Sequence, residues 1–275
     1  MKKPSLATLM LILGLIFLYL PMFILVFYSF NASRLVTVWA GFSTKWYVEL
    51  FKDKQMIGAV WTSLQIAFYN ACMAVVLGTM AAFILSRFGR FRGKTVFSGM
   101  VTAPLVMPDV ITGLSLLLMF VTLSDMIGWP AERGMLTIWI AHVTFSTAYV
   151  AVVVGSRLRE VDVSIEEAAM DLGATPMKTF FLITIPAIAP AIAAGWLLAF
   201  TLSLDDLVIS SFVAGPGSTT LPMVVFSSVR LGVSPKINAL ATLIILIVSL
   251  AAIIGWWLMR RSEKERLSAL LSLDR

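Results

Sequence analysis

The chain has 275 residues, of which 59% are hydrophobic and only 13% are charged. Soluble globular domains carry about 25% charged residues, so roughly half of the usual charge is missing. The high apolar content excludes a disordered chain, and a single cysteine, Cys72, excludes a scaffold of intrachain disulfides. The composition therefore indicates an integral membrane protein.

Uncharged stretches predict six membrane-spanning helices, because about 20 apolar residues are enough to cross a bilayer. Four of these stretches contain no Asp, Glu, Lys or Arg. The other two are interrupted only by acids, Asp109 within 95–124 and the pair Asp205 and Asp206 within 179–229. We expect an all-α protein whose helices span residues 6–30, 57–86, 95–124, 135–156, 187–213 and 237–259.

The distribution of Lys and Arg predicts the orientation of these helices, since cytoplasmic segments carry an excess of both. Fourteen of the 21 basic residues lie in the N-terminus, the second loop, the fourth loop and the C-terminal tail. Seven lie on the opposite side. Both termini are therefore expected to be cytoplasmic, and the net charge of +6 needs no nucleic-acid partner to explain it.

The fourth loop, residues 157–182, contains signals for two short helices outside the bilayer. Ser164 followed three residues later by Glu167 is a capping box, which predicts a helix start. Gly173 suits the end of that helix, and Thr175-Pro176 supplies an N-cap and a first-turn proline for the next one. Such a rigid helix–turn–helix fits a groove on a partner, although a solvated connector is the alternative. Its expected apolar face is Ala168, Ala169 and Leu172, edged by Glu166, Glu167 and Asp171.

The same loop carries a recognisable spacing. The segment reads Glu167-Ala168-Ala169, then Gly173 after three intervening residues, Ile183 after nine more, and then Pro186. Together these positions resemble the EAA signature of ABC-importer permeases. The one departure is Ile185, where that family usually has Leu. The resemblance implies a type I permease fold with six helices, treated as one domain over residues 1–275. It also implies that these six signature positions dock on a cytoplasmic ATPase. ATP and Mg would then be bound by that partner, and this chain would not be an enzyme.

Three carboxylates, Asp109, Asp205 and Asp206, fall inside predicted spans. An ionised Asp at the centre of a span raises the free energy of membrane insertion by about 2.5–3.5 kcal/mol. Such groups normally face a cavity or pathway, although here they could instead cap kinked helices or bond to nearby serines. Pro104 and Pro108 are expected to kink the helix beside Asp109. Adjacent helical residues point about 100° apart, so only one of Asp205 and Asp206 can face a central pathway directly. The spans contain no Lys or Arg, and a pathway with only negative charge favours a cationic cargo.

Three segments, residues 103–111, 200–212 and 232–241, resemble the permeases of bacterial polyamine importers, putrescine systems in particular. The resemblance implies that Asp109 and Asp205 act in substrate passage. It also implies an inner-membrane assembly with a second homologous permease, an ABC ATPase dimer and a periplasmic polyamine-binding protein. Trp196, Phe200 and Phe212 could supply aromatic walls for a polyamine. An importer of another cationic nutrient is the alternative, and a secondary transporter is a rival from a different class.

Two further features leave alternatives open. His142, the single histidine, could relay protons or could simply be hydrogen-bonded within the helix bundle. The loop 214–236 is unusually apolar, which predicts a short re-entrant or interfacial helix that other parts of the protein cover. A plain interfacial connector is the alternative for this loop.

Overall fold

The computed structural model describes residues 6–35, 38–232 and 234–273. Within these residues, six helical segments are long and apolar enough to cross a membrane, which confirms the predicted number of spans. Lys2, Lys3 and Arg275, which entered the charge count, lie outside the described residues. The six segments are Leu6–Tyr28, Lys54–Arg87, Asp109–Ile127, Met135–Glu160, Pro176–Asp205 and Pro235–Gly255.

The chain divides into two compact units, one formed by Met1–Lys54 with Ser227–Arg275 and the other by Gln55–Phe226. In the first unit, both α1 (Leu6–Tyr28) and α2 (Lys45–Lys52) pack against α12 (Pro235–Leu273). The ammonium group of Lys236 on α12 lies 3.0 Å from the carboxylate of Asp53, directly after α2. α12 ends at Leu273, beyond residue 259, where its end was predicted.

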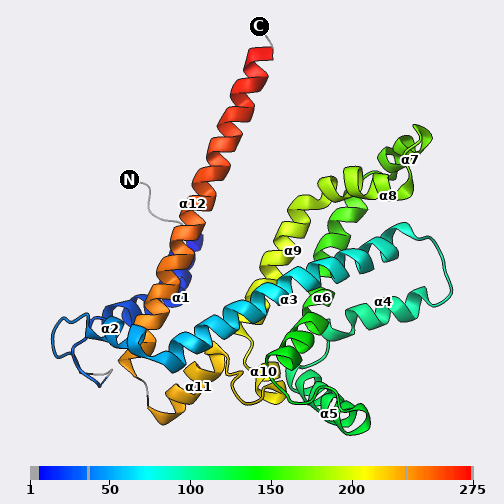
Figure 1. Ribbon diagram of the computed structural model, residues 1–275. Coiled ribbons are helices and arrows are strands. Elements are labelled where there is room, and N and C mark those ends of the chain that lie inside the picture. The colour runs from blue at the N-terminus through cyan, green and yellow to red at the C-terminus, as the bar shows by residue number, and fades with distance from the viewer. Residues whose placement is uncertain (1–5, 36–37, 233, 274–275) are drawn as a thin grey trace. The chain divides into compact units, whose positions relative to one another are not determined.

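The second unit is built around α3 (Lys54–Arg87), α6 (Met135–Glu160) and α9 (Ile185–Asp205), which meet at Val150 on α6. A Cβ atom on Gly78 of α3 would lie only 2.7 Å from the Cβ of Val150, and one on Gly195 of α9 would lie 3.3 Å from its Cγ1. Glycine at these two positions therefore lets three helices approach closely, which is a common way for helices to pack in membranes. Figure 1 shows α6 and α9 side by side.

The prediction of one helix over residues 95–124 is wrong, because the chain forms two helices there. α4 (Lys94–Thr102) leads through a 3-10 turn at Ala103–Leu105, and α5 (Asp109–Ile127) follows. Proline lacks a backbone N–H and disfavours helical geometry in the residue before it. Pro104 and Pro108 therefore separate the two helices rather than merely kinking one, and Figure 1 shows α4 and α5 as distinct helices.

The prediction of one helix over residues 187–213 is wrong for a similar reason. α9 ends at Asp205, and α10 (Val208–Val213) begins after a break at which Asp206 is extended, with φ −67° and ψ 122°. At its other end α9 continues without interruption from α8 (Pro176–Thr179) through a π-helical turn at Phe180–Thr184. The predicted apolar helix in the loop 214–236 is present as α11 (Leu221–Leu231), and the amide of Leu221 donates to the hydroxyl of Ser63 on α3 at 2.8 Å.

Candidate functional site

The loop between α6 and α9 folds as the predicted helix–turn–helix. α7 (Val163–Asp171) starts two residues earlier than the capping box indicated, because Asp162 is its N-cap and accepts a hydrogen bond from the amide of Ser164 at 3.0 Å. This bond from the Ser164 backbone, with a further one from the Ser164 hydroxyl, lowers the pKa of Asp162. The N-cap role predicted for Ser164 is therefore wrong, since Asp162 is the better placed acceptor.

Gly173 ends α7 as predicted. Its φ of +89° is left-handed, and its amide donates to the carbonyl of Met170 at 2.9 Å while the amide of Ala174 donates to that of Ala169 at 3.0 Å. This pair of bonds is a Schellman motif, which favours glycine at this position. Thr175 then caps α8 by accepting from the amide of Lys178, so the predicted start of the second helix is confirmed.

An ion pair absent from the predictions holds the loop against the membrane helices. The carboxylate of Glu166 accepts from Nε of Arg87 at 3.0 and 3.2 Å and from its Nη2 at 3.0 Å. The hydroxyl of Thr184 donates to the same carboxylate at 3.0 Å, and Nη2 of Arg87 also donates to the carbonyl of Val161 at 3.2 Å. The side chains of Arg87 and Glu166 are only 11% and 9% exposed. Glu166 is therefore buried against the membrane helices and does not form the edge of the apolar face that was predicted.

The six signature positions lie along this anchored loop. Ala168 and Ala169 share α7 with Glu167, which is exposed and lines a cavity of about 360 Å³ between α7, α8 and the end of α3. Ile183 lies in the π-helical turn, and Pro186 lies in the first turn of α9. Pro186 has no backbone N–H to donate to the preceding turn. The wider π-helical turn, which ends at Thr184, lies in that preceding turn.

The tip of the loop is apolar and exposed. Leu172, which was predicted to form an apolar face with Ala168 and Ala169, is 90% exposed, and Met177 on α8 is 66% exposed. Exposed apolar residues gathered on one short loop are typical of an interaction surface.

Asp109 is the first residue of α5 and is exposed. A carboxylate at a helix N-terminus is stabilised by the helix dipole, so a negative charge is tolerated there. One turn later, Gly113 faces α10. A Cβ atom on it would lie 2.7 Å from Cδ2 of Phe212 and 3.3 Å from Cα of Ile209. The start of α5 therefore lies alongside the residues that follow Asp206.

Asp206 and Asp205 have different environments at the break between α9 and α10. One carboxylate oxygen of Asp206 accepts from the amide of Ser210 at 2.7 Å, and the other accepts from that of Ile209 at 3.2 Å. Nε2 of His142 lies 3.1 Å from the same carboxylate. The side chain of Asp206 is only 8% exposed, whereas its neighbour Asp205 is exposed. Asp206 thus caps α10, and Asp205 is the member of the pair open to its surroundings.

His142 is fully buried on α6, where its two ring nitrogens contact hydroxyl groups. Nδ1 lies 2.6 Å from Oγ of Ser203, and Nε2 lies 3.0 Å from Oγ of Ser210. Deeper in the same unit, the amide of Asn70 on α3 donates to the hydroxyl of Ser146 at 3.0 Å and to the carbonyl of Ala199 at 2.9 Å. These polar contacts tie α3, α6, α9 and α10 together, as expected for a histidine hydrogen-bonded within the bundle.

Two of the three predicted aromatic residues, Trp196 and Phe200, pack together. The rings of Trp196 and Phe200 stack with their centroids 5.3 Å apart, and Phe68 on α3 contacts Trp196 edge-on at 5.9 Å. Phe200 also lines a cavity of about 360 Å³ with Trp61 and Tyr69 of α3. Phe212 belongs to a different cluster, since it packs on Gly113. Among the described residues, no group of three His, Cys, Asp or Glu side chains could hold a metal ion.

Comparison with known proteins defines the class of the chain. Residues 74–267 match the family described as binding-protein-dependent transport system inner membrane component, and the chain belongs to this family. With its six apolar spans, it is a multi-pass protein of the inner membrane. It is the non-catalytic permease subunit of an ABC transporter, in which a separate ATPase hydrolyses ATP.

Two curated relatives cover most of the chain. It is 69% identical over 257 residues to the putrescine transport system permease protein PotI of Escherichia coli K12, covering 94% of this chain and 92% of the relative. It is 42% identical over 247 residues to the spermidine/putrescine transport system permease protein PotC of the same strain, covering 90% of each.

Solved structures share the fold at low sequence identity. A chain of a bacterial ABC transporter involved in the import of the acidic polysaccharide alginate matches with a TM-score of 0.71 and 16% identity, over 95% of this chain and 99% of that one. The alginate transporter in complex with an alginate-bound periplasmic protein matches with a TM-score of 0.66 and 18% identity, over 89% and 88%. These likenesses confirm the importer-permease fold expected from the signature.

Proposed function

We propose that this chain forms half of the translocation pathway of an ATP-driven polyamine importer whose principal cargo is putrescine. The proposal is supported by the 69% identity to a putrescine permease over nearly the full chain. It is supported independently by the acids at both helix breaks. The stretches 57–86, 95–124, 135–156 and 187–213 contain these acids but no Lys or Arg, which favours a cationic cargo.

The pathway we propose contains Asp109 and Asp205. Asp109 is exposed at the start of α5, and Asp205 is exposed at the end of α9. The close contact of Gly113, one turn after Asp109, with α10, which begins three residues after Asp205, supports this proposal. In this proposal Asp206 stabilises the break between α9 and α10 that leaves Asp205 exposed. Its own carboxylate already accepts hydrogen bonds from the protein. Two separated carboxylates suit an extended dication better than a single one does.

The stacked rings of Trp196 and Phe200 form the aromatic wall of this pathway in our proposal. An aromatic face attracts an ammonium group and packs against the methylene chain between two ammonium groups. The cavity that Phe200 shares with Trp61 and Tyr69 is open and aromatic, as such a wall requires.

The assembly we propose has both termini in the cytoplasm, a second homologous permease, an ATPase dimer that binds ATP and Mg, and a periplasmic polyamine-binding protein. Glu167, Ala168, Ala169, Gly173, Ile183 and Pro186 form the surface that docks on the ATPase. The exposed apolar side chains of Leu172 and Met177 extend this surface. Movement of the ATPases would then be transmitted through the loop to the helix breaks, coupling two distant sites.

The experiment that tests the pathway is putrescine uptake by proteoliposomes containing the purified complex. Asp205→Asn removes the charge with little change in volume and is expected to reduce uptake at least tenfold, while the ATPase still co-purifies. Glu160→Gln is the matched control, because it removes an acid that pairs with Arg157 at the surface. Unchanged uptake by Asp205→Asn would remove this residue from the pathway.

A further inference from the structure

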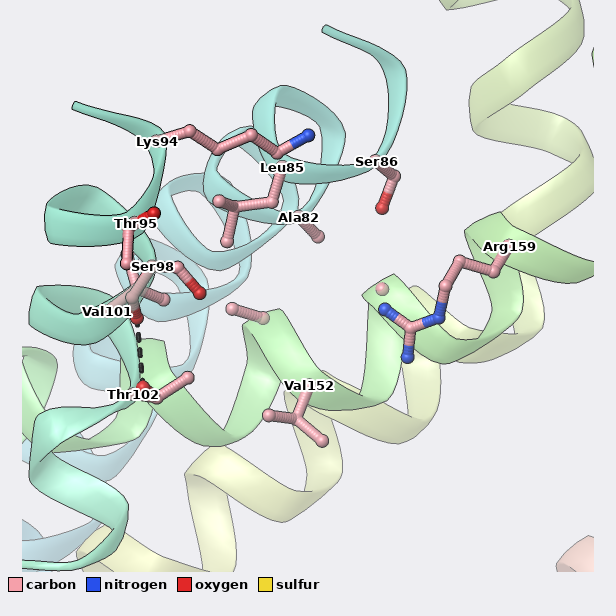
Figure 2. A pocket seen from close by; sticks show the side chains of 12 residues that line it. Ala82, Leu85, Ser86, Lys94, Thr95, Ser98, Val101, Thr102, Val152 and Arg159 are labelled. Atoms are coloured by element: carbon pink, nitrogen blue, oxygen red, sulfur yellow. Dashed lines mark hydrogen bonds between the residues drawn. The ribbon is translucent and has the colours of Figure 1, made fainter. Parts of the chain in front are cut away.

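A cavity of about 530 Å³ lies between α3, α4 and α6, and its lining includes neither the acids at the helix breaks nor the exposed tip of the loop. Its volume is within the range of small-molecule sites in proteins. Figure 2 shows Lys94 and Arg159 on its rim, with the hydroxyl-bearing Thr95 and Ser98 on the wall that α4 forms. Nothing in the transport role described above accounts for this cavity.

The cavity carries two positive charges without a carboxylate among its lining residues. The ammonium group of Lys94 donates to the carbonyls of Phe88 at 3.0 Å and Gly89 at 3.1 Å, which are neutral acceptors and leave its charge uncompensated. Arg159 lies on the opposite wall, with its Nη1 beside Gly155. Its neighbour Arg157 is different, since it pairs with Glu160 at 2.8 Å. A ligand that neutralises two cations must be anionic.

Leu85, Val101 and Val152 give the cavity an apolar part, here called its apolar floor. Ser86 and Thr102 also line it. The cavity lies where α3 and α6 approach their ends at Arg87 and Glu160, and these two helices are membrane spans. A site with a basic rim and an apolar floor at the end of two spans fits a ligand with an anionic head and a hydrocarbon tail. A free inorganic anion would leave the apolar floor unused.

We propose that this cavity binds the phosphate headgroup of an anionic phospholipid, with the first carbons of an acyl chain against the apolar floor. Basic pockets between membrane helices are known to hold such headgroups. Lys94 and Arg159 bind the phosphate, and the hydroxyls of Thr95 and Ser98 add hydrogen bonds. The bound lipid bridges α4 to α6 and stabilises the half of the broken span that precedes Pro104. This inference does not depend on which cargo the transporter carries.

The test uses the delipidated complex in detergent, titrated with phosphatidylglycerol and followed by native mass spectrometry. Each Lys or Arg near a lipid surface contributes about a fivefold gain in affinity, so Lys94→Gln with Arg159→Gln is expected to weaken binding about 25-fold. Arg90→Gln with Arg92→Gln removes the same charge from exposed residues outside the cavity and should leave binding unchanged. Lys94→Arg with Arg159→Lys conserves both charges and should also retain the lipid, which separates loss of the site from loss of the fold.

Phosphatidylcholine and inorganic phosphate distinguish the possible sources of the phosphate. The proposal predicts weak binding of the zwitterionic lipid, and no displacement of phosphatidylglycerol by an equal concentration of inorganic phosphate. It is overturned if the Lys94 and Arg159 double variant binds phosphatidylglycerol like the unmodified chain, if phosphatidylcholine binds equally well, or if equimolar phosphate displaces the lipid.

Discussion

The ion pair between Arg87 and Glu166 leads to a quantitative prediction about the loop that docks on the ATPase. Three N–H···O contacts of 3.0 to 3.2 Å join the two side chains, and both are about nine-tenths buried. Replacing Arg87 by Met removes the charge but keeps most of the volume. Because Glu166 is left buried and uncompensated, we expect the free energy that keeps α7 packed against the membrane helices to fall by about 3 kcal/mol. This loss corresponds to a factor of roughly 100 in the equilibrium for local opening of α7.

Hydrogen exchange measured by mass spectrometry on the purified complex reports this opening directly. Amides in α7 of Arg87→Met should exchange roughly 100-fold faster, while amides in α6 remain protected. Arg157→Met is the matched control, because the pair of Arg157 with Glu160 is exposed and contributes less than about 1 kcal/mol. ATPase activity in the Arg87 variant should no longer respond to the loaded binding protein, since the loop no longer transmits a displacement.

A double variant tests the reasoning more sharply than either single one. Arg87→Met with Glu166→Met replaces the pair by apolar groups, and such replacements of buried pairs are often neutral or stabilising. We expect this variant to recover most of the protection of α7. Unchanged exchange in Arg87→Met, or a double variant less protected than the single one, would refute the account of the loop as held by a buried pair.

Three further substitutions test other parts of the structure. Gly173→Ala should destabilise the folded loop by about 1 kcal/mol, because the φ of +89° is unfavourable for a residue with a side chain, and it should lower uptake in cells. Gly173→Asn should have a milder effect, and equal effects of the two variants would contradict this backbone argument. Gly113→Leu should separate α5 from α10 and abolish uptake, while membrane fractionation should show that the chain still inserts. Gly99→Leu is the control and should be tolerated, because there is open space around Gly99. Asp206→Ala should free two amides of α10 and lower the melting temperature of the complex by several degrees, and an unchanged melting temperature would exclude its capping role.

The membrane helices were predictable from the sequence because hydropathy alone determines how many segments can cross a bilayer. The two predicted helices that contain acids were wrong in the same way, since both are broken at the acid. At Asp109 the signal was present, because Pro104 and Pro108 lie just before it. At Asp206 the break depends on a side chain that caps its own chain and contacts His142, which is 64 residues away. Such a long-range contact has no local signature.

In the loop between α6 and α9, here called the docking loop, local features were also predicted correctly and a long-range contact was missed. Its turn at Gly173 and its second helix start at Thr175-Pro176 were predicted correctly, because caps depend on neighbouring residues. Glu166 was misplaced at an edge of the apolar face, since its partner Arg87 is 79 positions away and on another helix. Two adjacent glutamates look equivalent in the sequence, and only the packing of α7 against α3 distinguishes the buried one from the exposed Glu167.

The central claim is that this chain carries a cationic cargo and is driven by a separate ATPase through the docking loop. Its most direct test is accumulation of radiolabelled putrescine in proteoliposomes containing the complete complex, the binding protein and an ATP-regenerating system. The account predicts accumulation against a gradient that stops when ATP is omitted or when Glu167 is changed to Arg. Accumulation that continues without ATP, or equal transport of an anion of similar size, would contradict it.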